Sequence, residues 1–368
     1  MAISLPSLGC DKNEIDTPIL CVDLDVMEAN ILAMSEQCRR HSLGWRPHIK
    51  CHKSPLIARK LLDAGAMGVT CAKLGEAEVM SAAGIGELLV ANMIVGPKKL
   101  ARLVDLRRQT DLLVCVDHPV QAEAFDAVMR AAGLKLRVLV EVDLGMNRVG
   151  VAPGDAALRL ARAVDQLPGL QLAGVMGYEG HLLMLSDPQE KESRIRETLG
   201  WLVETKELLL RSGLPCPVVS CGGTGSFAQA VRQPGITELQ AGGGIFMDAF
   251  YREGCHVDQG NFALTVLATV VSRPTAERAV IDAGRKTMNV DVHPALVAGR
   301  NDILVESLSA EHGSLRLAPS ARDLPIGHRL EIVPGYSDLT CVLHDHMYGF
   351  RGNRLEVIWP LEARGRLQ

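Results

Sequence analysis

Short apolar runs alternate with amphipathic segments between about residue 45 and residue 248. The apolar runs have the length of strands, and the segments between them carry apolar positions at helical spacing. The predicted strands are Arg46–Lys50, Gly68–Cys71, Leu88–Asn92, Leu112–Val116, Arg137–Val142, Leu170–Met176, Pro217–Cys221 and Thr237–Ala241. Helical patterns lie between them, for example Pro55–Ala64, Leu74–Ala83, Pro97–Arg108, Pro119–Ala132, Asp155–Gln166 and Pro188–Arg211. Eight strand-then-helix units of this size predict an α/β fold with a (β/α)8 barrel, and a doubly wound open sheet is the alternative.

The pattern changes after Phe250, where short strands follow one another with turn residues and no long helix between them. The predicted strands are Phe262–Ser272, Arg278–Asp282, Ile303–Leu308, Ser314–Leu317, Arg329–Val333 and Leu355–Trp359. One more strand, Ile19–Asp23, precedes the first helix. We therefore expect an N-terminal segment (1–24) that pairs with a β-domain, a barrel (25–250) and a β-rich C-terminal domain (251–368).

Composition and charge exclude several classes of function. The chain has 368 residues and a net charge of −4, from 39 basic and 43 acidic side chains, without a basic stripe that would bind nucleic acid. It has no apolar run of about 18 residues, so we expect no membrane span. Its first 16 residues lack the pattern of a secretory signal, and its ten cysteines form no C-x-x-C pair. Both features favour reduced thiols and a cytoplasmic protein.

The turn that follows the first predicted barrel strand carries two lysines and two histidines, in the sequence Arg46-Pro47-His48-Ile49-Lys50-Cys51-His52-Lys53. Neighbouring cations lower the pKa of a lysine, and a lysine in that state can capture a carbonyl group. A basic surface turn with solvated lysines is the alternative. Because active sites of such barrels lie at the carboxyl ends of the strands, Lys50 is the candidate for a Schiff base.

Two glycine-rich turns follow the seventh and eighth predicted strands. The first is Gly222-Gly223-Thr224-Gly225-Ser226, and the second is Gly242-Gly243-Gly244. These are the positions at which barrels of this type often bind phosphate, because backbone N–H groups can approach the anion there. The alternative is that the glycines only make tight turns. No G-K-[ST] sequence follows, so neither turn is a Walker loop.

A strand-end lysine and a phosphate site on one barrel suit pyridoxal phosphate, whose aldehyde the lysine would hold. Tyr178 follows the sixth predicted strand and Arg148 follows the fifth. Either side chain could face the ring of the cofactor or its substituents.

At these residues the sequence resembles the D-threonine aldolase and eukaryotic-type D-serine dehydratase family, which has an alanine-racemase-like fold. The resemblance covers nearly the whole chain. It rests on Asp16-Thr17-Pro18, Arg46–Lys50 with His52-Lys53, Glu141-Val142-Asp143 with Arg148, Gly177–His181, Gly222–Ser226, Glu238–Gly242 with Phe246-Met247-Asp248, and Leu343-His344-Asp345.

The resemblance implies a pyridoxal-phosphate enzyme with a barrel, a β-domain and a homodimeric assembly. It makes Lys50 the Schiff-base lysine and places Tyr178 at the pyridine nitrogen. It also implies that Gly223, Thr224 and the Gly242–Gly243 turn hold the phosphate.

One departure from the family concerns its divalent metal, which a His-x-Asp or His-x-Cys motif binds after a Val-Pro pair. Here Val333-Pro334 leads to Tyr336 at the histidine position and Asp338 at the second position. Asp338 is therefore the one candidate ligand for Mn²⁺, Zn²⁺ or Mg²⁺ that remains of this motif, because a neutral phenol is a poor ligand. His344 and His346 lie nearby and could replace the missing histidine, although His344 is part of the family pattern in its own right.

These residues predict a lyase that acts on small D-β-hydroxy amino acids by retro-aldol cleavage to glycine and an aldehyde. Lys50 or His52 would then return a proton to Cα. The alternatives are a D-serine-type dehydratase, and a metal-independent racemase or epimerase that uses Lys50 and Tyr336. A pyridoxal-phosphate carrier without turnover is a further alternative, and the additional β-domain argues against it.

Overall fold

The computed structural model describes residues 5–368, which form two compact units. The first unit contains residues 1–33 and 243–364, and the second contains residues 34–242 and 365–368. The boundary between them falls within helix α1 (Leu24–Arg40).

The second unit is a parallel barrel of eight strands, in the order β2-β9-β8-β7-β6-β5-β4-β3. A parallel bridge between His48 and Thr70 closes the ring between its first and last strands. The strands are β2 (Gly44–Trp45), β3 (Val69–Cys71), β4 (Glu87–Val90), β5 (Asp111–Val116), β6 (Leu136–Val142), β7 (Leu170–Gly177), β8 (Val218–Cys221) and β9 (Glu238–Leu239). Parallel neighbours bring the carboxyl ends of all eight strands to one end of the barrel.

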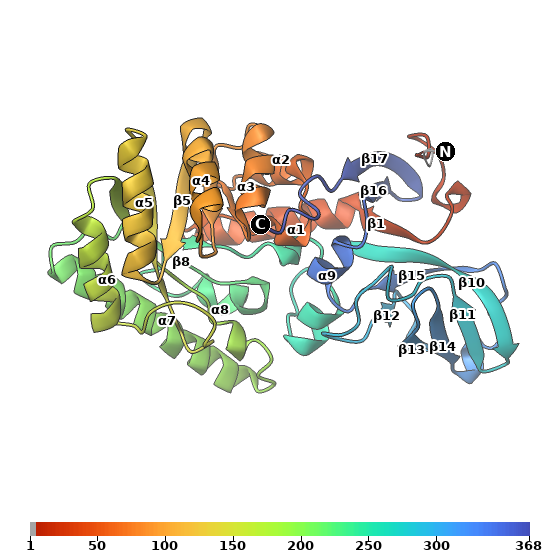
Figure 1. The fold of residues 1–368 in the computed structure, drawn as a ribbon. Helices are drawn as coiled ribbons and strands as arrows, with labels where there is room; N and C mark the ends of the chain where they lie inside the picture. The colour runs from red at the N-terminus through yellow and green to blue at the C-terminus, as the bar shows by residue number, and fades with distance from the viewer. Residues whose placement is uncertain (1–4) are drawn as a thin grey trace. The chain divides into compact units, whose positions relative to one another are not determined.

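Helices follow seven of these strands and cover the outside of the barrel (Figure 1). They are α2 (Pro55–Asp63), α3 (Leu74–Ala82), α4 (Pro97–Gln109), α5 (Pro119–Ala131), α6 (Asp155–Asp165), α7 (Pro188–Arg211) and the short α8 (Phe227–Ala230). Proline opens four of them, where its missing N–H costs nothing. Glycine at positive φ follows several, for example Gly65 and Gly213, because the left-handed conformation ends a helix.

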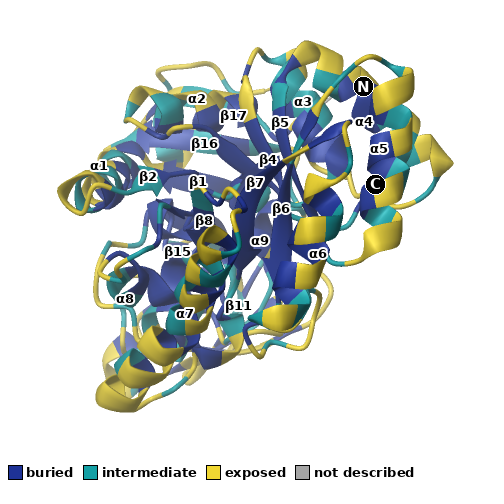
Figure 2. Cartoon of the chain, turned by 90° about the vertical axis from the view of Figure 1, so that its left-hand side faces the viewer, coloured by how far each residue is buried: buried dark blue, intermediate teal, exposed yellow. Residues whose placement is uncertain are grey.

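Burial follows the expected layers. Figure 2 shows the strands of the barrel in dark blue, with exposed residues on the outer faces of the helices. Four neighbouring strands contribute one apolar cluster to the core: Leu89, Leu113, Cys115, Leu139, Ala173 and Met176. The structure therefore confirms the predicted barrel and excludes the open sheet, whose outer strands would not meet.

The first unit is a sheet of nine strands, in the order β11-β14-β13-β12-β15-β10-β1-β16-β17. An additional pairing between β10 and β11 closes six of them into a small, mainly antiparallel barrel. The strands are β1 (Ile19–Asp23), β10 (Leu264–Thr275), β11 (Arg278–Ile281), β12 (Leu296–Val297), β13 (Ile303–Leu308), β14 (Gly313–Leu317), β15 (Arg329–Val333), β16 (His346–Arg351) and β17 (Arg354–Pro360). β1 pairs antiparallel with β10 and parallel with β16, and the short helix α9 (Ser337–Cys341) precedes β16.

One strand prediction needs correction, and two strands were not predicted. The first barrel strand is Gly44–Trp45, so the prediction of a strand over Arg46–Lys50 is wrong. Arg46 and His48 still donate to carbonyl oxygens of Leu239 and Gln240, but Pro47 has no N–H for a ladder, and the chain turns after His48 into a 3-10 helix, η2 (Ile49–Cys51). The sequence also gave no signal for β12 and β16. β12 has only two residues, and β16 contains His346, Gly349 and Arg351, which interrupt an apolar pattern.

All ten cysteines lie within the described residues, and none forms a disulfide. Nine of them are buried, and burial raises the pKa of the Cys71 and Cys221 thiols well above the ordinary value. These thiols therefore pack as small apolar side chains. None of the helices described in residues 5–368 combines the length and the apolar character that a membrane crossing requires.

Candidate active site

Lys50 lies in a tight turn at the carboxyl end of the first barrel strand. The N–H of Lys50 donates a hydrogen bond to Nδ1 of His48 (3.3 Å), which caps the 3-10 helix η2. Burial and the charges of Lys50, Lys53 and Arg148 hold the pKa of His48 well below its usual value. His48 is therefore neutral at physiological pH, and its Nδ1 remains an acceptor that fixes the backbone of the lysine turn.

The other lysine and histidine of this turn, Lys53 and His52, are buried within the protein. Lys53 is buried at positive φ, and its ammonium group forms an ion pair with the carboxylate of Glu76. His52 is fully buried, and its Nδ1 accepts a hydrogen bond from the N–H of Ser54 (3.1 Å). Burial lowers the pKa of His52 to about 3. An enclosed, neutral imidazole is poorly placed to exchange protons with a substrate, so the structure does not favour the predicted catalytic role of His52.

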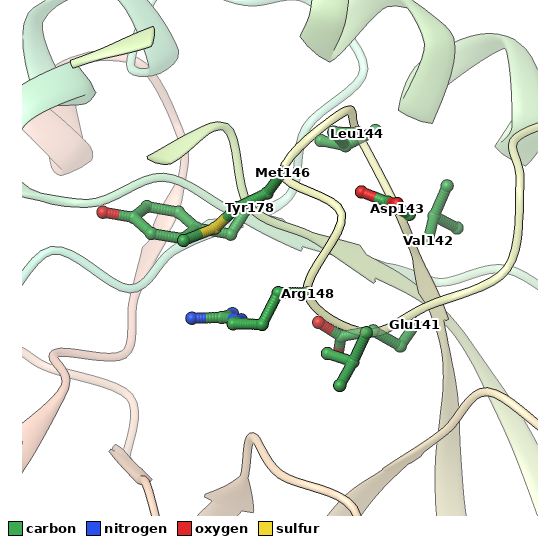
Figure 3. A pocket seen from close by; sticks show the side chains of 8 residues that line it. Glu141, Val142, Asp143, Leu144, Met146, Arg148 and Tyr178 are labelled. Carbon is green, nitrogen blue, oxygen red and sulfur yellow. The ribbon is translucent and has the colours of Figure 1, made fainter. Parts of the chain in front are cut away.

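Tyr178 follows β7, and two glycines enclose its ring. A Cβ atom added to Gly223 would lie 2.9 Å from the Tyr178 ring and hydroxyl, and one added to Gly180 would lie 2.5 Å from the ring. The guanidinium of Arg148 lies over the same ring, 5.7 Å from its centroid (Figure 3). The phenol is therefore held in one orientation at the end of the barrel, with a cation on one face.

The predicted glycine turn after β8 and the first glycine of the turn after β9, Gly242, lie at this end of the barrel. A Cβ atom at Gly242 would lie 2.2 Å from the carbonyl oxygen of His48, so the β9 turn packs directly on the lysine turn. In the β8 turn, Ser226 Oγ accepts a hydrogen bond from the N–H of Gly223 (3.1 Å) and donates one to the carboxylate of Glu179. Thr224 is buried in the same turn. Gly243 belongs to the other unit, where its Cα faces the phenol of Tyr251.

This arrangement fits pyridoxal phosphate. Glycine at positions 223 and 242 lets the ring of Tyr178 and the backbone of His48 pack closely against the two turns, and a lysine, a phenol and a guanidinium stand at the same end of the barrel. Lys50 would hold the aldehyde, and the N–H groups of the glycine turns would hold the phosphate. The sequence suggested Ser226 as a hydroxyl donor of the phosphate turn, but it indicated no role for His48 or Glu179. Each of these two residues lies one or two positions from a predicted site residue, which was the only signal for it.

At the family's metal position, which lies in the first unit, Tyr336 and Asp338 contact each other. The hydroxyl of Tyr336 donates a hydrogen bond to Oδ2 of Asp338 (2.8 Å). The ring of Tyr336 packs edge-on against Phe250 and Tyr251, with centroids 5.3 and 5.9 Å away. The phenol therefore occupies an Asp338 oxygen that a metal ion would need, and its ring is held in place by two other aromatic side chains.

Neither nearby histidine replaces the missing ligand. His344 is half-buried, and its Nε2 lies 2.7 Å from the carbonyl oxygen of Thr287. His346 begins strand β16 and packs beside Tyr348. Among the residues that the structure describes, no three His, Cys, Asp or Glu side chains come together in a way that could hold a metal. The donor set around Asp338 does not fit a divalent metal.

Comparison with known families gives two matches that together cover most of the chain. The family described as "Alanine racemase, N-terminal domain" matches residues 22–249. The family described as "Putative serine dehydratase domain" matches residues 263–350.

Individual relatives match along nearly their whole length. The D-threonine aldolase of Arthrobacter sp is 38% identical over 355 residues, which are 95% of this chain and 93% of that protein. The 3-hydroxy-D-aspartate aldolase of Paracoccus denitrificans (strain Pd 1222) is 35% identical over 98% of this chain and 96% of that protein. The crystal structure of D-threonine aldolase from Filomicrobium marinum superposes with a TM-score of 0.95 and 38% identity, over 99% of both chains.

Proposed function

The chain belongs to the family of D-threonine aldolases and eukaryotic-type D-serine dehydratases, and from this membership we propose that it is a pyridoxal-phosphate-dependent lyase of D-β-hydroxy amino acids. The observation that carries the proposal is the lysine turn. Lys50 stands at the barrel's carboxyl end, on a backbone fixed by His48 and packed against Gly242.

Each residue of the barrel site has a task in this proposal. When bound, pyridoxal phosphate supplies an electron sink that allows a bond at Cα of the amino acid to break. The amine of Lys50 holds the cofactor's aldehyde until a substrate amine replaces it. Lys50 then serves as the proton donor at Cα, once Cα–Cβ has broken and the aldehyde has left. Tyr178 would face the pyridine nitrogen, as the family resemblance implies, and a neutral phenol there would leave the ring a weaker sink than a carboxylate would.

Phosphate binding falls to Gly223, Thr224, Gly242 and Gly243 in this proposal. We expect Gly223→Ala combined with Thr224→Val to weaken pyridoxal phosphate binding by about tenfold or more, because an added Cβ would push against Tyr178 and a hydroxyl donor is lost. Equilibrium dialysis of the purified protein measures the effect.

Gly200→Ala is the matched control for this prediction. Gly200 lies in α7, and a Cβ atom there would meet no other atom within 4 Å. Alanine also favours a helix interior. We expect this variant to bind the cofactor as the wild type does. Unchanged affinity of the double variant would contradict the assignment of the phosphate turn.

The reaction itself is tested by product analysis. We expect D-threonine to give glycine and acetaldehyde, and 3-hydroxy-D-aspartate to give glycine and glyoxylate, while the L-enantiomers give neither. Retro-aldol cleavage transfers the β-hydroxyl proton to a base as Cα–Cβ breaks, so glycine and aldehyde form in equal amounts. Keto acid with ammonia in place of these products would show the dehydratase branch of the family.

A racemase or epimerase is the second candidate, and one observation favours it. The phenol of Tyr336 is held by Asp338 at the position where the family's lyases carry a metal ligand. A tyrosine and a lysine can together exchange the Cα proton of an amino acid without a metal ion. Formation of the opposite enantiomer without glycine or keto acid would identify this activity.

We further propose that the protein is a cytoplasmic homodimer that acts on small amino acids. The dimer follows from the family resemblance, and the free cysteines, nine of them buried, favour the cytoplasmic location. Neither nucleic acid nor membrane lipid has a part in the proposed activity.

A further inference from the structure

The carboxyl group of Glu141 is a buried polar group in the barrel to which the proposed chemistry gives no role. Glu141 lies near the end of β6, and its side chain is 3% exposed. It lines a small pocket together with Arg148 and Tyr178 (Figure 3). The thiol of Cys115, on the neighbouring strand β5, shares a hydrogen bond with the carboxyl. Within residues 5–368 its Oε2 has no hydrogen-bond partner, which is costly for a buried charge.

The charges around Glu141 come from three sides. Arg148 attracts the ionised carboxylate, and Asp117 at the end of β5 and Asp143 after β6 repel it. Glu238 on β9, which also faces Cys115, is already paired with Arg46 at 3.0 Å. Burial outweighs the attraction of Arg148 and raises the pKa of Glu141 to about 7. Glu141 therefore changes its charge near neutral pH.

Arg148 is exposed on the loop that follows β6, and the base of this loop is fixed. A parallel bridge joins Val142 to Val151, and the N–H of Val151 donates to the carbonyl oxygen of Glu141 (3.0 Å). In Figure 3 the side chain of Arg148 extends towards the ring of Tyr178, with its guanidinium turned away from the carboxyl of Glu141. Because the base of the loop is fixed and Arg148 is exposed, its side chain can turn towards Glu141 without movement of the strand that carries Glu141.

We propose that Glu141 is a positioning residue whose charge decides whether the guanidinium of Arg148 is available to an anionic group of the cofactor beside Tyr178. The inference rests on the proposed cofactor site. A neutral Glu141 leaves Arg148 over the Tyr178 ring, where the cofactor can reach it. An ionised Glu141 draws Arg148 towards β6 and repels the anionic cofactor. Cofactor binding is then accompanied by proton uptake on Glu141.

The first test compares pyridoxal phosphate dissociation constants of the wild type and of Glu141→Gln between pH 6 and 8.5. We expect the ratio of the wild-type constant to the variant constant to rise at least threefold across this range, and to be nearly flat below about pH 6. Ionisation of the cofactor's phosphate and of Lys50 occurs in both proteins, so it cancels in the ratio. Glu204→Gln, which removes an exposed carboxyl group on α7, should follow the wild type.

The second test measures thermal unfolding without cofactor, a readout that needs no activity. The pKa of Glu141 is raised on folding, so ionisation favours the unfolded chain. The destabilisation of the folded chain by ionised Glu141 is absent below the unfolded pKa of about 4.5 and is complete above about pH 7. The melting temperature of Glu141→Gln minus that of the wild type should therefore increase as pH rises from 5 to 8.

The outcomes separate this inference from the proposed function. A pH-independent ratio of dissociation constants, with normal cofactor binding, would overturn the role of Glu141 alone. A difference in melting temperature that does not change with pH would do the same, because Glu141 would then not titrate. Absence of cofactor binding by the wild type would overturn the proposed function and this inference with it.

Discussion

Replacement of Lys50 by alanine is expected to abolish turnover, with a loss on the order of 10⁴-fold or more, because the group that holds the cofactor's aldehyde and moves the Cα proton is gone. The fold should survive, since the turn is held by backbone contacts of His48 and Gly242. Borohydride reduction of the wild type should fix the cofactor on Lys50. Peptide mapping, the product assay and thermal unfolding measure the three effects.

Lys53→Ala is the matched comparison, three residues along the same turn. Its ammonium pairs with Glu76, and both side chains are nearly inaccessible, at 8% and 0% exposure. Removal of one partner leaves a buried charge uncompensated, which costs about 3–5 kcal/mol of folding stability. Lys53→Ala should therefore melt earlier, yet its folded fraction should still attach the cofactor. Reduced cofactor on Lys53, or activity that survives in Lys50→Ala, would exclude the assignment of Lys50.

Much of the barrel could be predicted because its signals are local. Proline at a helix start and glycine at positive φ after a helix set the bounds of α2 and α7, and α7 begins and ends at the predicted residues. The turns that carry Arg148, Tyr178 and Gly223 follow from strand ends, which a short apolar run marks clearly. These residues lie close together because the carboxyl ends of all the parallel strands lie at one end of the barrel.

Other features depend on contacts that no local pattern contains. Lys50 leaves the strand early because Pro47 lacks an N–H and Gly242 packs against His48, a residue almost two hundred positions away in the chain. The burial of His52 likewise follows from packing and not from its neighbours in sequence. The first unit was predicted less well, because β12 is two residues long and its partners are set by tertiary contacts.

At the metal position, the sequence and the structure together predict weaker metal binding than the family motif would give. The hydroxyl of Tyr336 already donates a hydrogen bond of 2.8 Å to Oδ2 of Asp338, so a cation at that oxygen would have to displace the phenol. We expect the wild type to bind Mn²⁺ and Zn²⁺ weakly, and Tyr336→His to bind them about tenfold more tightly or better, since imidazole and carboxylate oxygen are both ordinary ligands of these ions. Calorimetric titration of the metal alone measures the difference.

Two variants control this experiment. Tyr336→Phe removes the hydroxyl without adding a ligand, so it should not gain metal affinity. Tyr336→His combined with Asp338→Asn should lose the gain. Tight binding by the wild type, abolished in Asp338→Asn, would show that the protein builds a metal site despite Tyr336.

The same variants decide between the lyase and the racemase when products are assayed with and without a chelator. A lyase that works without a metal ion should form glycine and aldehyde in the presence of the chelator. Full loss of that activity on chelation, with recovery on addition of Mn²⁺ or Zn²⁺, would contradict the expectation of weak metal dependence. Exchange of enantiomers that resists the chelator and disappears in Tyr336→Phe would instead assign the reaction to the phenol, because only its ionisable hydroxyl differs between the two proteins.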